Sequence, residues 1–350
     1  MKRVLAGIVG AMLALPWGWH LLLVARGMAL FAAAGLLSYA LVPAAIAVAR
    51  RVGAVDVPDA RRMHDAPTPR MGGLAILAAA NLVVGLHFDF SLPLKGAIIS
   101  GAIVAAVSAW DDARSLPAAV KLVAQIAAAG VLWVFGVRLD FAPEAWGAWG
   151  EAIEFFVFVC WMVGIANAFN FLDGLNGLAA SLAMLICGLM AILAIYTHQS
   201  YMALLVSVIA GAAAGFLPDN ARFSQPARCF MGDVGSIYLG WMMAAAAVMG
   251  AWSDLGPLFA YGAPLLIFSV MIFDMIYTTI ARIARGDVRS FREWIEYTGK
   301  DHLHHRLLMM GMSPKAAVWS ILAVAWITGT AGIALVRAPA FSAILLLAQG

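Results

Sequence analysis

Residues 178–217 read LAASLAMLICGLMAILAIYTHQSYMALLVSVIAGAAAGFL and contain no lysine, arginine, aspartate or glutamate. A helix needs about 20 apolar residues to cross a hydrocarbon core of about 30 Å. This stretch is long enough for two crossings, at 178–197 and 200–217, joined by a short polar turn. Backbone groups in lipid must be hydrogen-bonded within the protein, so the stretch predicts two membrane-spanning helices.

The remainder of the chain has the same character. Of its 350 residues, 64% are hydrophobic and only 12% are charged, whereas a typical soluble domain is about 25% charged. A soluble globule of this composition would expose large apolar patches and aggregate. We therefore expect one all-α, polytopic membrane domain over residues 1–350. The three cysteines have no close spacing that indicates a zinc knuckle or a disulfide framework, and a net charge of +3 is too small to indicate nucleic acid as a partner.

Low-charge stretches of crossing length recur along the chain and predict about ten to eleven transmembrane helices. They cover approximately residues 4–24, 28–49, 71–88, 95–110, 118–138, 153–170, 178–197, 200–217, 235–252, 257–281 and 316–336. A stub at about 339–349 is too short to cross alone. We interpret the first stretch as a retained anchor, because no clear cleavage site leads from it into a soluble domain.

The lysines and arginines predict the orientation, because short cytoplasmic loops are enriched in them. With a cytoplasmic N-terminus, 18 of the 22 basic residues lie in inner segments. The outer side keeps only Arg26, Lys95, Arg138 and Arg337.

Four polar clusters interrupt the apolar sequence, and all of them fall on this inner side. Along the chain they are Asp111-Asp112, the segment from Asn167 to Gly177, Gly232-Asp233, and the segment from Asp301 to Arg306. Taken singly, each is also typical of a helix end or a solvated loop. Together they concentrate more carboxylates, amides and histidines than separate helix ends require, so we interpret them as one site.

The second cluster combines helical spacing with glycine. If the helix continues to its end, Asn167, Asn170 and Asp173 share one face, because residues three apart are neighbours on a helix. Gly174 and Gly177 then end the helix and let the backbone approach a ligand.

The third and fourth clusters suit phosphate. The ninth span opens at Asp233, where free N–H groups of a helix N-terminus favour an anion, and Asp233 itself suits an N-cap or a metal ligand. His302, His304 and His305 precede Arg306, and such residues bind a diphosphate, move a proton or ligate a transition metal.

The four aspartates decide which cation is expected. Asp111, Asp112, Asp173 and Asp233 supply hard oxygen ligands, which favour Mg²⁺ or Mn²⁺. Magnesium is normally held by one or two carboxylates together with substrate phosphates. The residues therefore predict a phosphoryl-transfer site on a metal-bound diphosphate, with lipid entering from the membrane and a soluble substrate from the cytoplasm.

The order of these motifs resembles that of the polyprenyl-phosphate N-acetylhexosamine-1-phosphate transferase family (glycosyltransferase family 4), over about residues 50–315. The matching segments are 56–64, Pro69-Arg70-Met71-Gly72-Gly73, Asp111-Asp112, 121–125, 170–177, 230–236 and His302 to Leu308. The resemblance implies that a UDP-N-acetylhexosamine and a membrane-embedded polyprenyl phosphate react to give polyprenyl-diphospho-sugar and UMP. It also implies a bacterial inner-membrane protein with a cytoplasm-facing site, and it leaves a homodimer open.

The resemblance assigns one group of residues to the metal and the lipid phosphate. Asp233 and Asn170 are the metal-site residues, and Asp112 supports the metal region. Asp111 accepts the proton of the lipid phosphate or positions that phosphate, and Lys121 binds it.

The resemblance assigns a second group of residues to the nucleotide and the sugar. Asp173, Asn176 and Asn220 are assigned to substrate binding, and Phe230 to stacking on uracil. The diphosphate or sugar is assigned to His302, His304, His305 and Arg306. Asn176 departs from the pattern of many bacterial relatives, which have a second aspartate there. Asp274, inside the tenth span, is expected to be a structural hydrogen-bonding residue, and His64 matches a family position.

Several alternatives remain. The histidine segment is more similar to that of WecA, TagO and WbpL than to the three-histidine run of MraY, which favours initiation of a surface polysaccharide over the peptidoglycan step. A secondary transporter would also combine intramembrane acids with glycine-broken helices, but these acids lie toward one membrane face. A CDP-alcohol phosphatidyltransferase would need a longer acidic pattern than the sequence contains.

Overall fold

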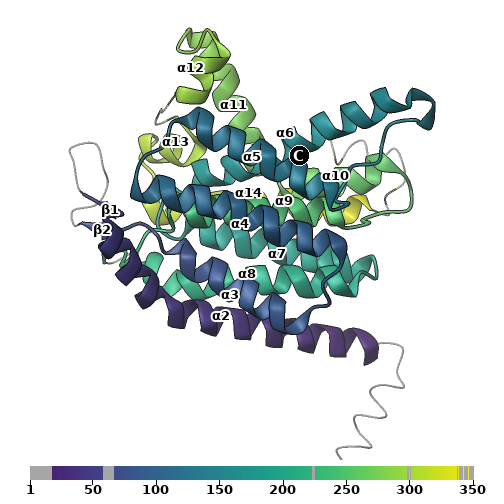
Figure 1. Cartoon of the computed structure of the whole chain (residues 1–350), viewed down its shortest axis with the longest axis horizontal. Coiled ribbons are helices and arrows are strands. Elements are labelled where there is room, and N and C mark those ends of the chain that lie inside the picture. Colours follow the sequence, from purple (N-terminus) through teal and green to yellow (C-terminus); the bar gives the residue numbers. More distant parts are fainter. Residues whose placement is uncertain are drawn as a thin grey trace, which may run out of the picture.

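The computed structural model describes residues 18–57, 67–222, 225–297, 299, 301–336, 338, 342 and 346, and these are mostly helical, with one two-stranded sheet (Figure 1). The elements are α2 Gly18–Val52, β1 Val55–Asp56, β2 Thr68–Pro69, α3 Gly73–His87, α4 Leu92–Ala113, α5 Ala118–Val134, the short 3₁₀ helix Glu144–Trp146, α6 Ala148–Leu172, α7 Leu178–Tyr196, α8 Ser200–Asn220, α9 Gly232–Met249, α10 Pro257–Ile267, α11 Ser269–Arg285, α12 Phe291–Glu296, α13 Leu303–Met309 and α14 Pro314–Leu335.

The helices confirm a polytopic all-α membrane fold. Within the described residues, seven are long and apolar enough to span a membrane, and a bent pair makes up to eight. Two further apolar helices, α3 and α5, have 15 and 17 residues. At about 1.5 Å per residue these reach about 22 and 26 Å, slightly less than the hydrocarbon core.

The boundary predicted between spans at 4–24 and 28–49 is wrong, because the single helix α2 runs through it. Arg26 is exposed on this helix, and a long cationic side chain can reach the polar boundary while its backbone stays helical. The neighbouring Gly27 is buried and packs against Ser207 of α8. Residues 4–17, most of the stub at 339–349, and Lys2, Arg3, Arg61, Arg62, His64, Lys300 and Arg337 lie outside the described residues.

The predicted span at 257–281 is a broken helix instead of a straight one. α10 and α11 meet at Phe268 with a bend of 75°, and α11 stands out from the bundle together with α12 (Figure 1). Asp274, Thr278 and Arg282 are buried on one face of α11. The bend directs this polar face toward the segment that contains the predicted histidine cluster.

The core is organised around α9. In an apolar stretch of 18 residues, 78% of the residues of α9 are buried, whereas the corresponding share for α2, at the edge of the bundle, is 22%. Tyr238 and Trp241 are almost completely buried, and the Trp241 Nε1 donates a hydrogen bond of 2.9 Å to Ser100 Oγ of α4. α9 therefore serves as the axis on which the other helices position their ends.

The start of α9 is held by the segment that leads into α3. Gly72 N donates to Phe230 O at 2.9 Å, and Gly73 N donates to Met231 O at 2.8 Å. A Cβ atom on Gly73 would overlap the backbone of Gly235, so glycine lets the two helices approach directly. α4 and α6 end, and α5 and α9 begin, at this end of the bundle, which we call the site end.

Candidate functional site

Asp112 anchors the first turn of α9 at the site end. Its carboxylate is buried and accepts hydrogen bonds from Asp233 N at 3.1 Å and Val234 N at 3.0 Å. The Arg70 guanidinium in turn donates to the Asp112 carbonyl oxygen at 2.8 and 3.1 Å. Asp112, at the end of α4, thus caps the first turn of α9. The sequence suggested this role for Asp233 itself.

Asp233, Asn170 and Ser236 form the next layer. Asn170 Nδ2, near the end of α6, donates to Asp233 Oδ1 at 3.0 Å and to Ser236 Oγ at 2.7 Å. Asp233 and Asn170 are both partly exposed. The structure therefore places the two predicted metal-site residues side by side, on helices that begin and end at the same level.

Lys121 joins this layer to Asp111. Its Nζ lies 2.7 Å from Asp111 Oδ2 and 3.5 Å from Asp233 Oδ2. Asp111 Oδ1 accepts a hydrogen bond of 2.6 Å from Leu116 N. Lys121 has three donors, and two of them are directed at these carboxylates, so one remains for a further anion.

Asp173 ends α6 and lies close to the same carboxylates. Burial raises the pKa of the Asp173 carboxyl well above its ordinary value, and the negative charges of Asp233 and Asp112 raise it further. The side chain keeps some exposure, as does that of Asn176 in the following turn. A cation that enters the site would favour the ionised form of the Asp173 carboxyl and so lower its pKa.

Asn220 holds the glycine turn in shape. Its Oδ1 accepts a hydrogen bond of 2.7 Å from Gly177 N, which has a φ of +81° that favours glycine, and its Nδ2 donates to Cys229 O at 3.1 Å. Asn220 is buried, so its amide supports the turn from beneath. Phe230, next to Cys229, is only partly buried, and a direct contact of either residue with the substrate stays a prediction.

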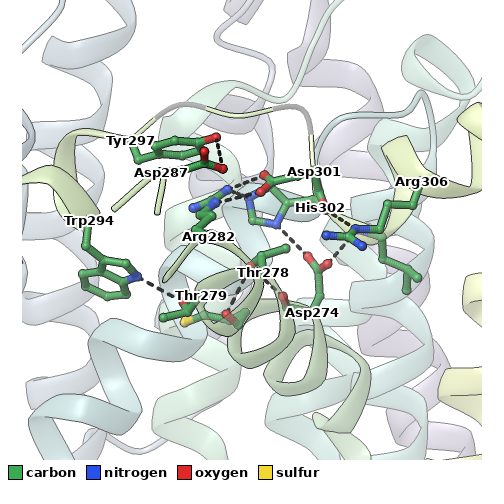
Figure 2. Close-up of polar contacts among 12 residues, drawn as sticks. Asp274, Thr278, Thr279, Arg282, Asp287, Trp294, Tyr297, Asp301, His302 and Arg306 are labelled. Atoms are coloured by element: carbon green, nitrogen blue, oxygen red, sulfur yellow. Dashed lines mark hydrogen bonds and ion pairs between the residues drawn. The ribbon is translucent and has the colours of Figure 1, made fainter. Parts of the chain in front are cut away.

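The predicted histidine cluster divides into two kinds of residue. The His302 ring is bonded on both sides, to Asp274 and Arg282 (Figure 2). Arg306 donates to the Asp301 carbonyl oxygen and, at 2.9 Å, to Tyr277 OH. Both residues are therefore engaged within the protein, and the expected structural role of Asp274 is confirmed.

His304 is the contrasting case. It is buried against Gly174, and neither of its ring nitrogens has a hydrogen-bond partner in the described part of the chain. Burial lowers the pKa of the His304 imidazole to about 3, and His305, whose ring centroid lies 4.1 Å away, lowers it too. His304 is therefore a neutral imidazole over the glycine turn, beside the predicted nucleotide side.

Sequence reasoning gave no role to Gln125 and Arg282, which complete the site, and placed Asn167 only on one helix face with Asn170 and Asp173. Gln125 and Asn167 exchange side-chain hydrogen bonds beside Lys121, at 2.6 and 3.4 Å. Arg282 was counted only as a basic loop residue, although it is buried and forms a bidentate pair with Asp301 at 2.6 and 2.9 Å. Gln125 stood within a matching motif, which was the one available signal.

The oxygens of Asp233 and Asn170 suit a hard cation. The Asn170 amide nitrogen is used by Asp233 and Ser236, which leaves its carbonyl oxygen for another partner. Carboxylate and amide oxygens are the ligands that Mg²⁺ prefers. Among the described residues, no group of three or more His, Cys, Asp or Glu side chains could enclose a metal. The donor set therefore fits an open site that substrate phosphates complete.

Known proteins match the chain over much of its length. A family model described as glycosyl transferase family 4 matches residues 94–251. The chain is 31% identical over 295 residues to the probable undecaprenyl-phosphate N-acetylglucosaminyl 1-phosphate transferase of Bacillus subtilis, covering 82% of this chain and 79% of that protein. It is 32% identical over 348 residues to the decaprenyl-phosphate N-acetylglucosaminephosphotransferase of Mycobacterium tuberculosis, covering 89% and 83%.

A different branch matches over a shorter range. A phospho-N-acetylmuramoyl-pentapeptide-transferase of Streptococcus uberis is 32% identical over 130 residues, covering 36% of this chain and 35% of that protein. The extent of the longer matches confirms the resemblance that the ordered motifs predict, and the chain belongs to glycosyl transferase family 4.

Proposed function

We propose that this protein transfers N-acetylhexosamine 1-phosphate from a UDP-N-acetylhexosamine to polyprenyl phosphate and releases UMP. The observation that carries the proposal is the position of Lys121 between Asp111 and the Asp233–Asn170 pair, where apolar helices end. A lipid phosphate arriving from the membrane and a nucleotide diphosphate arriving from water would meet there. The names of the Bacillus and Mycobacterium relatives support the same pair of substrates.

Asp233 and Asn170 would hold a divalent cation, Mg²⁺ or alternatively Mn²⁺. When bound, the cation would neutralise charge on the diphosphate and on the departing UMP. Asp112 would keep Asp233 in place, because it fixes the backbone N–H groups of Asp233 and Val234.

Lys121 would bind the lipid phosphate with its remaining donor. Asp111 would hold the Lys121 ammonium in position, because one of its oxygens contacts Nζ and the other is used by Leu116 N. A lipid phosphate is already largely ionised near neutral pH, so little proton removal is required of Asp111. We therefore favour positioning of the phosphate as the main role of Asp111.

The donor substrate would occupy the side formed by the α6–α7 turn. Asp173 and Asn176 would contact the nucleotide, with Phe230 against the uracil ring. His304 and His305 would contact the diphosphate or the sugar. Since His304 is neutral, it would donate or accept a hydrogen bond there without adding charge.

The relatives and the charge pattern support proposals for the pathway and for the membrane. Relatives that match over most of the chain are named for N-acetylglucosamine transfer, whereas the muramoyl-pentapeptide branch matches only in part. We therefore favour N-acetylglucosamine as the sugar and initiation of a surface polysaccharide as the role. The distribution of lysine and arginine supports a multi-pass protein of the bacterial inner membrane with the site facing the cytoplasm. A homodimer stays a prediction.

The test uses purified protein, polyprenyl phosphate, Mg²⁺ and a panel of UDP-N-acetylhexosamines that includes UDP-N-acetylmuramoyl-pentapeptide. We expect UMP release that requires both the lipid and the metal and is highest with UDP-N-acetylglucosamine. A preference for the pentapeptide substrate would assign the protein to the peptidoglycan step. Vesicle uptake of a UDP-sugar without any lipid-linked product would support a transporter and reject the proposal.

A further inference from the structure

Asp274 joins the bent helix α11 to the start of α13 (Figure 2). Its Oδ2 lies 2.8 Å from His302 Nδ1, and its Oδ1 accepts a hydrogen bond of 2.6 Å from Leu303 N. Asp274 and His302 are 3% and 6% exposed. A buried carboxylate is costly unless it is fully hydrogen-bonded, and these two donors, one on each oxygen, meet that requirement.

Arg282 determines where the proton of His302 lies. Arg282 Nη2 is 3.2 Å from His302 Nε2, and a guanidinium has donors only. His302 Nε2 must therefore be the acceptor, so Nδ1 carries the hydrogen and donates it to Asp274. Arg282 is fixed in turn by its bidentate pair with Asp301. His302 is thus a neutral ring with both nitrogens used inside the protein.

The face of the His302 ring packs on the end of α6. His302 stacks on Phe171 with ring centroids 4.8 Å apart and an interplanar angle of 26°. Phe171 directly follows Asn170 and lies two residues before Asp173. On the other side, His302 begins the segment that places His304 over Gly174. The His302 ring therefore connects the end of α6 to the start of α13.

We propose that Asp274 is a positioning residue, which acts through His302 to hold the metal-site end of α6 and the His304 end of α13 at a fixed separation. The inference rests on the proposed function for its catalytic consequence. It changes the role predicted for His302, which supports the site from behind, and leaves contact with the substrate to His304 and His305 as proposed above.

Asp274→Asn tests the proposal with almost no change of shape. An amide has one accepting end and one donating end, whereas both groups that face Asp274 are donors. If His302 moved its hydrogen to Nε2 to accept from the asparagine, that hydrogen would meet the Arg282 guanidinium. One hydrogen bond is lost in every arrangement. We expect kcat to fall by about 10- to 100-fold, as for other residues that orient a site, with KM for either substrate little changed.

His302→Gln and His302→Leu separate positioning from chemistry. A glutamine amide donates to Asp274 and accepts from Arg282, so His302→Gln should retain most of the wild-type kcat and its pH profile. His302→Leu keeps neither bond and should lose turnover as Asp274→Asn does. A proton-transfer group or diphosphate ligand would lose turnover equally in both variants. Equal losses, or a wild-type kcat in Asp274→Asn, would overturn the proposal.

Ser100→Ala is the matched control for a lost buried hydrogen bond. Ser100 is completely buried and accepts from Trp241 in the helical core, outside the histidine segment. This variant should lower the thermal stability while turnover stays near that of the wild type. If Asp274→Asn and Ser100→Ala lost equal stability and equal turnover, the effect of Asp274 would be structural only.

A measurement on the wild-type protein does not depend on turnover. In the full chain with ¹⁵N-labelled histidine in lipid, the ring of His302, assigned by its loss in His302→Gln, should show a hydrogen on Nδ1 and a bare Nε2. A hydrogen on Nε2, or a doubly protonated ring, would reject the inference. A wild-type protein that turns over no UDP-sugar would reject the proposed function, and the ring measurement would still decide the positions of these hydrogens.

Discussion

Two acidic regions of the molecule differ in how their charge is balanced. The carboxylate cluster consists of Asp111, Asp112, Asp173 and Asp233, and the histidine network consists of Asp274, Asp301, His302, Arg282 and Arg285. The cluster has Lys121 and, at 4.0 Å, Arg70 as cationic partners. In the network, arginines surround Asp301 and both oxygens of Asp274 are hydrogen-bonded. The carboxylate cluster therefore keeps negative charge that can bind a cation. In the histidine network the charges are already paired or hydrogen-bonded, so its role is to support the structure.

The largest expected effect is in the carboxylate cluster. Asp233→Ala removes the carboxylate that we assign to the cation, and turnover should be abolished while the protein still folds, as judged by its elution and thermal unfolding in detergent. Asp233 is partly exposed and accepts from Asn170, so the fold loses little. Retained UMP release in this variant would remove Asp233 from the metal site.

Lys121→Met should have the next largest effect. Methionine keeps the length of the side chain but removes the ammonium that balances Asp111 and Asp233. We expect kcat/KM for polyprenyl phosphate to fall by about 100-fold, in line with the loss of one charge-assisted contact of about 3 kcal/mol. KM for the UDP-sugar should change less. A larger defect on the nucleotide side than on the lipid side would contradict the assignment of Lys121 to the lipid phosphate.

His304 should make the free energy of unfolding depend on pH. The folded pKa of His304 is about 3, against an ordinary value of 6.5. Between these values the unfolded chain binds a proton that the folded chain does not. The free energy of unfolding should therefore fall as the pH falls below 6.5, by at most about 1.4 kcal/mol per pH unit from this group.

Asp301 titrates in a separate window and so does not obscure this effect. Burial alone would raise the pKa of Asp301, but the hydrogen bonds and charges of Arg282 and Arg285 lower it to about 2. Its contribution to stability is present above the ordinary value of 3.8 and is lost only as the pH falls toward 2. Asp173, whose pKa is raised, contributes a slope of the opposite sign in this range. The prediction is therefore a difference between variants: from pH 7 to 4.5, the unfolding free energy of the wild type should fall relative to that of His304→Gln. An unchanged slope in that variant would mean that another group is responsible.

The smallest effect is expected away from both regions. Arg138 and Glu151 form an ion pair of 3.2 Å whose side chains are 49% and 61% exposed. Exposed pairs contribute about 0–1 kcal/mol, so Arg138→Ala should leave turnover unchanged and shift the unfolding free energy by less than about 1 kcal/mol. A clear loss of turnover would show that the site reaches farther than the site end.

The sequence predicts the carboxylate cluster well because its residues lie at helix ends with strong local signals. Asp111-Asp112 follows an apolar run, Asn170 and Asp173 precede glycines, and Asp233 follows Gly232. Apolar runs that must all cross one bilayer alternate in direction, so their inner ends meet. For these residues, local pattern and orientation were sufficient.

The histidine network depends on distant pairings and on a bend that the hydropathy of the span does not reveal. Arg282 pairs with Asp301 19 residues away, and Asp274 pairs with His302 28 residues away. The span at 257–281 looked continuous because its apolar residues run through Phe268, and Pro264, one turn before the bend, was the signal that could have been used. A single arginine likewise suggested an end at position 26, where packing of Gly27 on α8 keeps α2 continuous.

The cap that Asp112 provides for α9 has a consequence for biosynthesis. Asp112 and Asp233 are 121 residues apart, which at 5–20 residues per second is a delay of about 6–24 s on the ribosome. During that delay α4 is already made, but the N–H groups that will satisfy its buried carboxylate do not yet exist. The newly made helix must keep this carboxylate near water or protonated until α9 arrives. The order of synthesis therefore delays completion of the site end until α9 has been made.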